Sequence, residues 1–169
     1  MGCCTSHAEV FRATITVAPG GVTCEEARDF LTKGSSWKDI QNKPDAAVVV
    51  QSDSWDLQLD GTSNGDVFTV YDTELKTDAS GNLVLSYRGT LKISPGVLDF
   101  GQTYTFTTGE NGMKIDRHVH DLQISGCVSC FGCCFASMMP ASLEGENESI
   151  ERLLNGLHIP ELATAIVPS

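Results

Sequence analysis

Basic side chains are scarce in this chain: 11 Lys and Arg stand against 22 Asp and Glu, which gives a formal net charge of −11 at pH 7. Proteins that bind nucleic acid use clustered cations to contact phosphates, so the charge balance argues against a nucleic-acid partner. It argues equally against electrostatic adhesion to anionic lipid. The sequence also lacks a Gly-rich phosphate loop, a Rossmann fingerprint and a nucleophile elbow, so common nucleotide and hydrolase chemistry has no support.

The chain does contain enough apolar material for one folded domain. It has 169 residues, of which 41% are hydrophobic, and this length and composition are typical of one globular domain rather than of a disordered chain. We expect a single domain over residues 9–160. A flexible, acylated segment over residues 1–8 should precede it, and a tail over residues 161–169 should follow it.

The sequence begins MGCCTS, which fits the pattern for myristoylation of Gly2 after removal of the initiator methionine. One myristoyl chain binds membranes only marginally, so stable anchoring needs a polybasic patch or a second acyl chain. No basic run is present near this end, and we therefore predict palmitate on Cys3 and Cys4. With no secretory signal visible, the expected location is the cytoplasmic face of a membrane in a eukaryotic cell. The competing interpretation is a flexible terminus with two incidental cysteines.

The periodicity of apolar residues predicts an α+β chain dominated by antiparallel strands. We expect a strand over residues 9–17, a helix within 23–33 that Thr23 and Glu26 begin as a capping box, and a helical turn over 36–40. Turn residues separate the later strand segments. These segments are residues 46–59, 66–77, 82–93, 97–108 and 112–124, of which 66–77 also fits a helical pattern. A last helix is expected over residues 149–157, after a polar break at 144–148. The predicted fold is a strongly curved antiparallel sheet packed against a few helices.

An uncharged stretch, residues 122–143, contains Cys127, Cys130, Cys133 and Cys134. Its glycines, serines and proline make it a poor transmembrane helix. The cysteines allow three interpretations. They could form a zinc site, although the cluster is too compact to surround a tetrahedral ion easily; they could belong to a palmitoylated loop that touches a membrane; or they could fill a buried strand end as small hydrophobic side chains. We assign no metal and no cofactor to the chain.

Three polar residues, Asp116, His118 and His120, alternate along one predicted strand and therefore share a face of it. Two histidines in this spacing can bind a metal, but a catalytic zinc takes three protein ligands and no third histidine lies nearby. In a cavity, the three could instead act as a catalytic acid and base near neutral pH. The alternative is an ordinary strand face turned to solvent.

Residues 86–122 resemble the closing sheet of NTF2-like, SnoaL-related proteins. The matching motifs are a Tyr-x-Phe strand, here Tyr104-Thr105-Phe106, and a final strand of the form G-K-I-x-R-H, here Gly112 to His118 with one extra residue, Met113. The resemblance implies a cone-shaped α+β roll with an apolar pocket, and often a homodimer formed through the sheet. It also implies an Asp/His pair inside the cone.

The order of the predicted elements is similar to that of a second family, the START/Bet v1-like helix-grip proteins. In both, a leading strand precedes short helices, a run of antiparallel strands and a late helix. Both resemblances imply a concave sheet that holds a small hydrophobic molecule. The aromatic residues expected to line such a pocket are Trp37, Trp55, Tyr71, Tyr87, Tyr104 and Phe106.

Three functions follow as hypotheses. The first is a membrane-anchored, cytosol-facing domain that binds a small hydrophobic ligand without catalysis. The second is a cofactor-independent isomerase, cyclase or dehydratase that uses Asp116, His118 and His120. The third is a membrane-tethered module for protein interaction or dimerisation.

Overall fold

The computed structural model describes residues 5–62, 64–93, 96–126 and 132–157. These residues form seven strands and three helices in an α+β arrangement. In chain order the elements are β1 (Thr5–Val17), α1 (Cys24–Thr32), α2 (Gly34–Ile40), β2 (Ala47–Val50), β3 (Trp55–Gln58), β4 (Val67–Thr77), β5 (Leu83–Ile93), β6 (Gly96–Gly109), β7 (Gly112–Gly126) and α3 (Gly132–Gly156).

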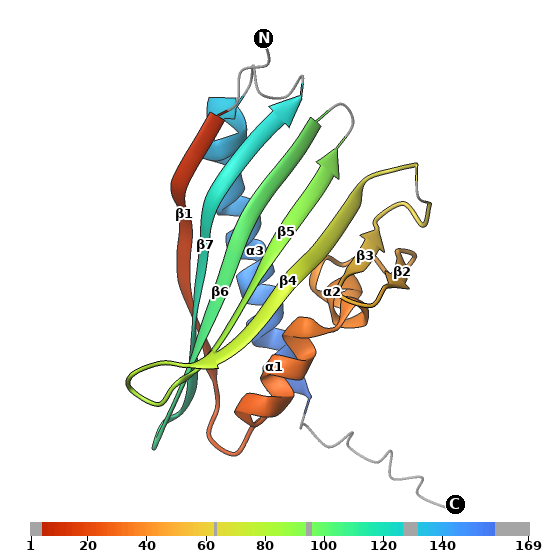
Figure 1. The fold of residues 1–169 in the computed structure, drawn as a ribbon. Coiled ribbons are helices and arrows are strands. Elements are labelled where there is room, and N and C mark those ends of the chain that lie inside the picture. The colour runs from red at the N-terminus through yellow and green to blue at the C-terminus, as the bar shows by residue number, and fades with distance from the viewer. Residues whose placement is uncertain (1–4, 63, 94–95, 127–131, 158–169) are drawn as a thin grey trace, which may run out of the picture.

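One sheet contains all seven strands, in the order β1-β7-β6-β5-β4-β3-β2, and every pair of neighbours is antiparallel. The sheet curves, and α3 runs along one of its faces (Figure 1). The prediction of a curved antiparallel sheet with a few helices is therefore confirmed. In chain order, a leading strand is followed by two short helices, six strands and a final helix.

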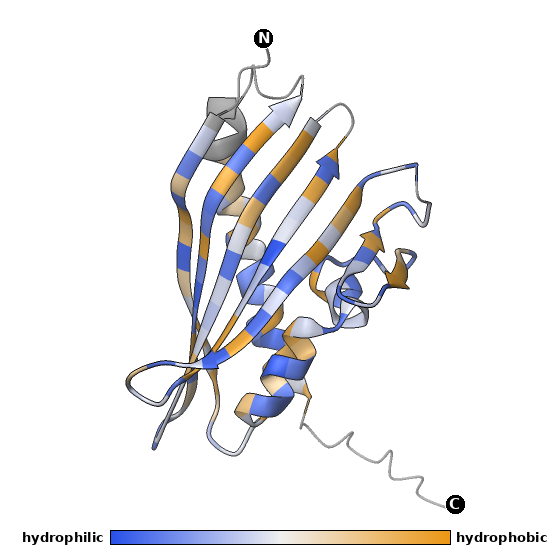
Figure 2. Ribbon diagram, in the orientation of Figure 1, coloured by the Kyte–Doolittle hydropathy of each residue, from blue (hydrophilic) through white to orange (hydrophobic). Residues whose placement is uncertain are grey.

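The sheet has one buried face and one partly exposed face, as the period of two along a strand requires. In β7, Met113, Ile115 and Val119 are buried, whereas the intervening Lys114 and Asp116 are exposed. Figure 2 shows the same alternation of hydrophobic and hydrophilic residues along the long central strands. The buried face, called the inner face below, packs against α3 and carries the core.

The start of α1 is as predicted. The Thr23 hydroxyl accepts a hydrogen bond from the Glu26 amide N–H at 3.2 Å, and the Glu26 carboxylate accepts one from the Thr23 amide at 2.8 Å. Gly34 begins the next helix, α2. A Cβ atom on Gly34 would lie 2.7 Å from Val48 Cγ1, so glycine permits α2 to approach β2 closely.

Three of the predicted elements differ in their bounds from those in the structure. Residues 46–59 form two strands rather than one, because the polar residues after Val50 make a turn in which the Gln51 amide donates to the Ser54 carbonyl. The sheet also extends to Thr5, so that residues 5–8 belong to β1 and not to a flexible segment. The strand over residues 66–77 is confirmed as β4.

The last helix is much longer than the predicted 149–157. It begins at Gly132, contains Pro140 and continues through the polar residues 144–148. These polar residues do not break the helix because two of them face the interior: Asn147 is buried, and Glu146 hydrogen-bonds to Gln41 and Arg117. Cys133 and Cys134 lie in this helix, so the interpretation of the cluster as a buried strand end is wrong for them. Cys127 and Cys130 lie outside the described residues.

Candidate functional site

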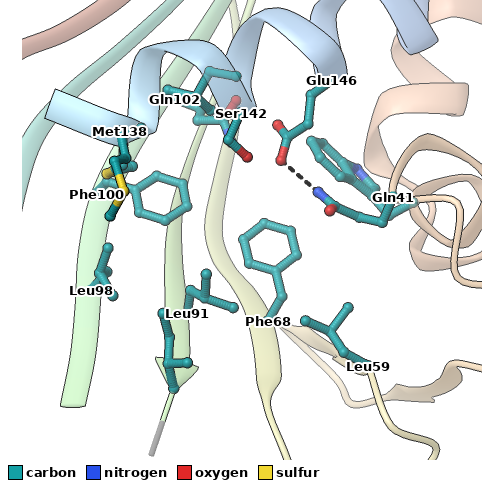
Figure 3. Close-up of a pocket in the computed structure, with 14 residues that line it drawn as sticks. Gln41, Leu59, Phe68, Leu91, Leu98, Phe100, Gln102, Met138, Ser142 and Glu146 are labelled. Atoms are coloured by element: carbon teal, nitrogen blue, oxygen red, sulfur yellow. Dashed lines mark hydrogen bonds between the residues drawn. The ribbon is translucent and has the colours of Figure 1, made fainter. Parts of the chain in front are cut away.

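A cavity of about 270 Å³ lies between the inner face of the sheet, α2 and α3 (Figure 3). Most of its wall is apolar. The apolar lining residues are Trp37, Leu59, Phe68, Leu91, Ile93, Leu98, Phe100, Met138, Met139 and Leu143. The polar lining residues are Gln41, Gln102, Ser142 and Glu146. A largely apolar cavity with a few polar groups is the usual form of a small-molecule site.

The strands supply the floor of the cavity through their alternation. Leu91 on β5 pairs with Leu98 on β6, so both side chains project from the same face. Phe68 on β4 stacks on Phe100 with ring centroids 6.1 Å apart and an interplanar angle of 7°. In Figure 3 these side chains project from the sheet towards α3, where Ser142 and Glu146 lie. The floor is thus a continuous apolar surface over three strands.

A hydrogen-bonded network forms the polar side of the cavity. Arg117 on β7, whose side chain is fully buried, donates from Nη2 to Glu146 Oε2 at 2.6 Å and from Nε to Gln102 Oε1 at 3.0 Å. Gln41 on α2 donates from Nε2 to Glu146 Oε1 at 2.6 Å. The guanidinium therefore connects the sheet to α3, and the carboxylate connects α3 to α2.

Two buried tyrosines extend this network. The Tyr104 hydroxyl donates to Gln102 Oε1 at 2.8 Å and lies 3.2 Å from the Tyr87 hydroxyl. Burial raises the pKa of both tyrosines, so both hydroxyls stay protonated at neutral pH. The pKa of Arg117 is raised above its ordinary value: burial opposes this, but Tyr104 and Glu146 favour the cation. The guanidinium also lies 5.9 Å from the ring centroids of Phe11 and Tyr104.

The three predicted catalytic residues do not line this cavity. Asp116, His118 and His120 lie on the opposite, outer face of the sheet, where Asp116 accepts a hydrogen bond from the Thr14 hydroxyl at 2.7 Å. The two imidazole centroids are 4.7 Å apart, and His120 Nε2 lies 3.2 Å from the Thr103 hydroxyl. Partial burial lowers the pKa of His118, with the nearby Arg12 adding to the effect. The sheet therefore brings the three residues together, but separates them from the enclosed space.

Among the predicted aromatic residues, only Trp37 lines the cavity. Trp55, Tyr87, Tyr104 and Phe106 are buried in the surrounding core. Tyr71 lies on the outer face, where its hydroxyl donates to Asp99 at 2.5 Å and Arg88 forms an ion pair with the same carboxylate. These five residues do not line this cavity, because their side chains fill the core or point away from the inner face.

Two features of the described residues bear on membranes and metals. No helix in them is both long and apolar enough to cross a bilayer. Among the side chains that the structure describes, which do not include those of residues 132–137, no three from His, Cys, Asp or Glu come together as a metal site would require. The predicted lipidation residues Gly2, Cys3 and Cys4 lie outside the described residues.

No family model matches this sequence, and no curated protein is significantly similar to it. The chain does align with solved structures. An uncharacterised protein from Rhizobium leguminosarum, 8% identical, aligns over 90% of this chain and 99% of its own with a TM-score of 0.50. The Mll3558 protein from Rhizobium loti, 12% identical, aligns over 90% and 96% of the two chains with a TM-score of 0.46. The di-domain ARO/CYC StfQ from the steffimycin biosynthetic pathway, 11% identical, aligns over 92% of this chain and 50% of its own with a TM-score of 0.43. At 8% identity, the similarity to the protein from Rhizobium leguminosarum indicates the fold alone.

Proposed function

We propose that this protein binds a small hydrophobic molecule in the cavity between the sheet, α2 and α3. The observation that carries the proposal is the cavity itself, whose apolar walls come from three strands and two helices and whose polar groups gather on one side. An apolar ligand would gain free energy by leaving water for this space, and the few polar groups would orient it.

Binding fits the arrangement better than catalysis by the predicted acid–base residues. Asp116, His118 and His120 lie across the sheet from the cavity, so a ligand in the cavity cannot reach them. A general acid or base must lie within hydrogen-bonding distance of the reacting group. The carboxylate of Glu146 does line the cavity, but Gln41 and Arg117 already occupy both of its oxygens. We therefore do not propose an isomerase, cyclase or dehydratase that uses those three residues.

A variant that fills the cavity tests the proposal. Leu91→Trp is expected to weaken binding of the neutral fluorescent probe N-phenyl-1-naphthylamine at least tenfold, since the indole would occupy the space that the probe needs. Binding is measured by fluorescence titration, and folding by circular dichroism of the same sample.

The matched control is Lys92→Trp. Lys92 is the next residue of β5 and is exposed, so the same indole is added to the other face of the sheet. Lys92→Trp should bind the probe as the wild type does. Equal probe affinity in wild type and Leu91→Trp, both folded, would place binding elsewhere.

We also propose that lipidation of Gly2, Cys3 and Cys4 holds this binding domain at the cytoplasmic face of a membrane, where hydrophobic ligands dissolve. The support is the sequence MGCCTS together with the absence of a basic run near it. In a eukaryotic cell, Gly2→Ala is expected to move the protein from the membrane fraction to the soluble fraction. Cys3→Ser with Cys4→Ser should do so partially, because a single myristoyl chain binds reversibly. Fractionation of Gly2→Ala identical to that of the wild type would contradict the anchor.

A further inference from the structure

The side-chain amide of Gln102 has its orientation fixed by its neighbours. Gln102 is only 1% exposed, yet it lines the cavity. Its Oε1 atom faces Arg117 Nε at 3.0 Å, and a guanidinium nitrogen can only donate. The amide atom that faces Arg117 must therefore be the oxygen. The Tyr104 hydroxyl donates to the same oxygen at 2.8 Å, and this second hydrogen bond favours the same orientation of the amide.

This orientation leaves the Gln102 amino group on the other side of the amide. The Gln102 oxygen accepts hydrogen bonds from two buried residues, Arg117 and Tyr104. In contrast, no hydrogen bond among the described residues uses Gln102 Nε2. Because Gln102 lines the cavity, an acceptor atom of a bound ligand would give this N–H group a partner when the ligand excludes water from it. We propose, on the basis of the binding function above, that Gln102 Nε2 donates a hydrogen bond to a carbonyl oxygen of the ligand.

The charges around the cavity restrict the ligand further. Glu146 places a carboxylate in the same wall, and its partner Arg117 lies behind Gln102 rather than in the lining. A ligand that carries its own carboxylate would meet the negative group without direct access to the positive one. The ligand class is therefore a neutral, largely apolar ketone, aldehyde, ester or amide.

Two isosteric compounds separate this inference from simple hydrophobic binding. 2-Acetylnaphthalene has a carbonyl oxygen where 2-isopropenylnaphthalene has a =CH₂ group, while their apolar surfaces are nearly equal. In displacement of N-phenyl-1-naphthylamine from the wild-type protein at pH 8, the ketone is expected to bind about fivefold tighter or more. 2-Naphthoate, which is anionic at that pH, is expected to bind more weakly than the ketone.

Variants of Gln102 assign the preference to its amino group. Gln102→Glu keeps two oxygens for Arg117 and Tyr104 but loses the N–H donor, and it should bring the two isosteres close to equal affinity. Gln102→Met, which removes the whole amide, should do the same if Gln102→Glu does not fold. Ser142→Ala is the matched control, because it removes a different uncharged polar group of the lining, on α3, and should leave the preference unchanged.

Each outcome decides one of the two proposals. If the wild type does not bind the probe at all, the binding function itself is wrong. If it binds the probe but holds both isosteres equally, or prefers 2-naphthoate, only the carbonyl inference is overturned. A preference that survives both Gln102 variants and disappears in Ser142→Ala would also overturn it, since the donor would then be the serine hydroxyl.

Discussion

Replacement of Arg117 by methionine is expected to lower the free energy of unfolding by about 3–5 kcal/mol, which is the usual effect of removing one partner of a buried ion pair. The Arg117 side chain is fully buried, and Glu146 is 17% exposed. Without the guanidinium, the carboxylate of Glu146 would keep only the hydrogen bond from Gln41. Gln102 would keep only the one from Tyr104. Methionine fills a similar volume, so the loss would come from unpaired polar groups rather than from a cavity.

Urea denaturation followed by circular dichroism measures the effect. The double variant Arg117→Met with Glu146→Gln should regain part of the lost stability, since a neutral amide is cheaper to bury than an unpaired carboxylate. Arg12→Met is the matched control: Arg12 lies on the exposed face of β1, pairs with Glu9, and should change stability little. A loss in Arg117→Met no larger than that in Arg12→Met would show that the network does not stabilise the fold.

Trp37→Ala should produce a loss of similar size, about 3–5 kcal/mol, typical of a buried aromatic residue replaced by alanine. Trp37 is completely buried and packs on Phe68 and Trp55, with ring centroids 5.4 and 6.5 Å away. Its indole N–H donates to the Leu31 carbonyl at 2.9 Å, near the end of α1. The substitution therefore removes contacts between α2 and the sheet and leaves a buried carbonyl without this donor.

Trp37→Phe is the control, because it keeps an aromatic ring and loses mainly the indole N–H. Its destabilisation should be clearly smaller than that of Trp37→Ala. Circular dichroism is the appropriate signal in both cases, since removal of a tryptophan changes the intrinsic fluorescence directly. A Trp37→Ala protein as stable as the wild type would mean that the junction of α2 and the sheet contributes little to the fold.

The sequence predicted the sheet well because alternation and turn chemistry are local signals. The residues of β5, β6 and β7 alternate clearly, and the capping box at Thr23 needs only neighbouring residues. The length of α3 was not predictable in the same way. Its polar residues read as a break, and only the contacts of Glu146 with Arg117 and Gln41, distant in the chain, show why that part of the helix packs against the core.

The site was missed for a related reason. The residue types of Asp116, His118 and His120 make them candidates for an acid–base site. Their positions alternate with the apolar Ile115 and Val119, however, and so belong to the outer face. Arg117 shares the parity of Ile115 and Val119, as Gln102 on β6 shares that of Phe100 and Tyr104. In the sequence, the polar side of the cavity was therefore indicated by polar residues at strand positions where the alternation would place apolar ones. The position of the helices that enclose the cavity depends on packing and could not be obtained from the strands.

The pairing of β1 with β7 joins the first and the last strand in chain order, with Thr5 opposite Ile124. During synthesis, β1 leaves the ribosome first and has no strand to pair with until nearly the whole chain has followed. Such end-to-end pairing raises the contact order, which slows folding and leaves the apolar residues of β1 exposed meanwhile. The strand nearest the N-terminus is thus among the last to gain its neighbour, and the sheet is complete only once β7 has formed.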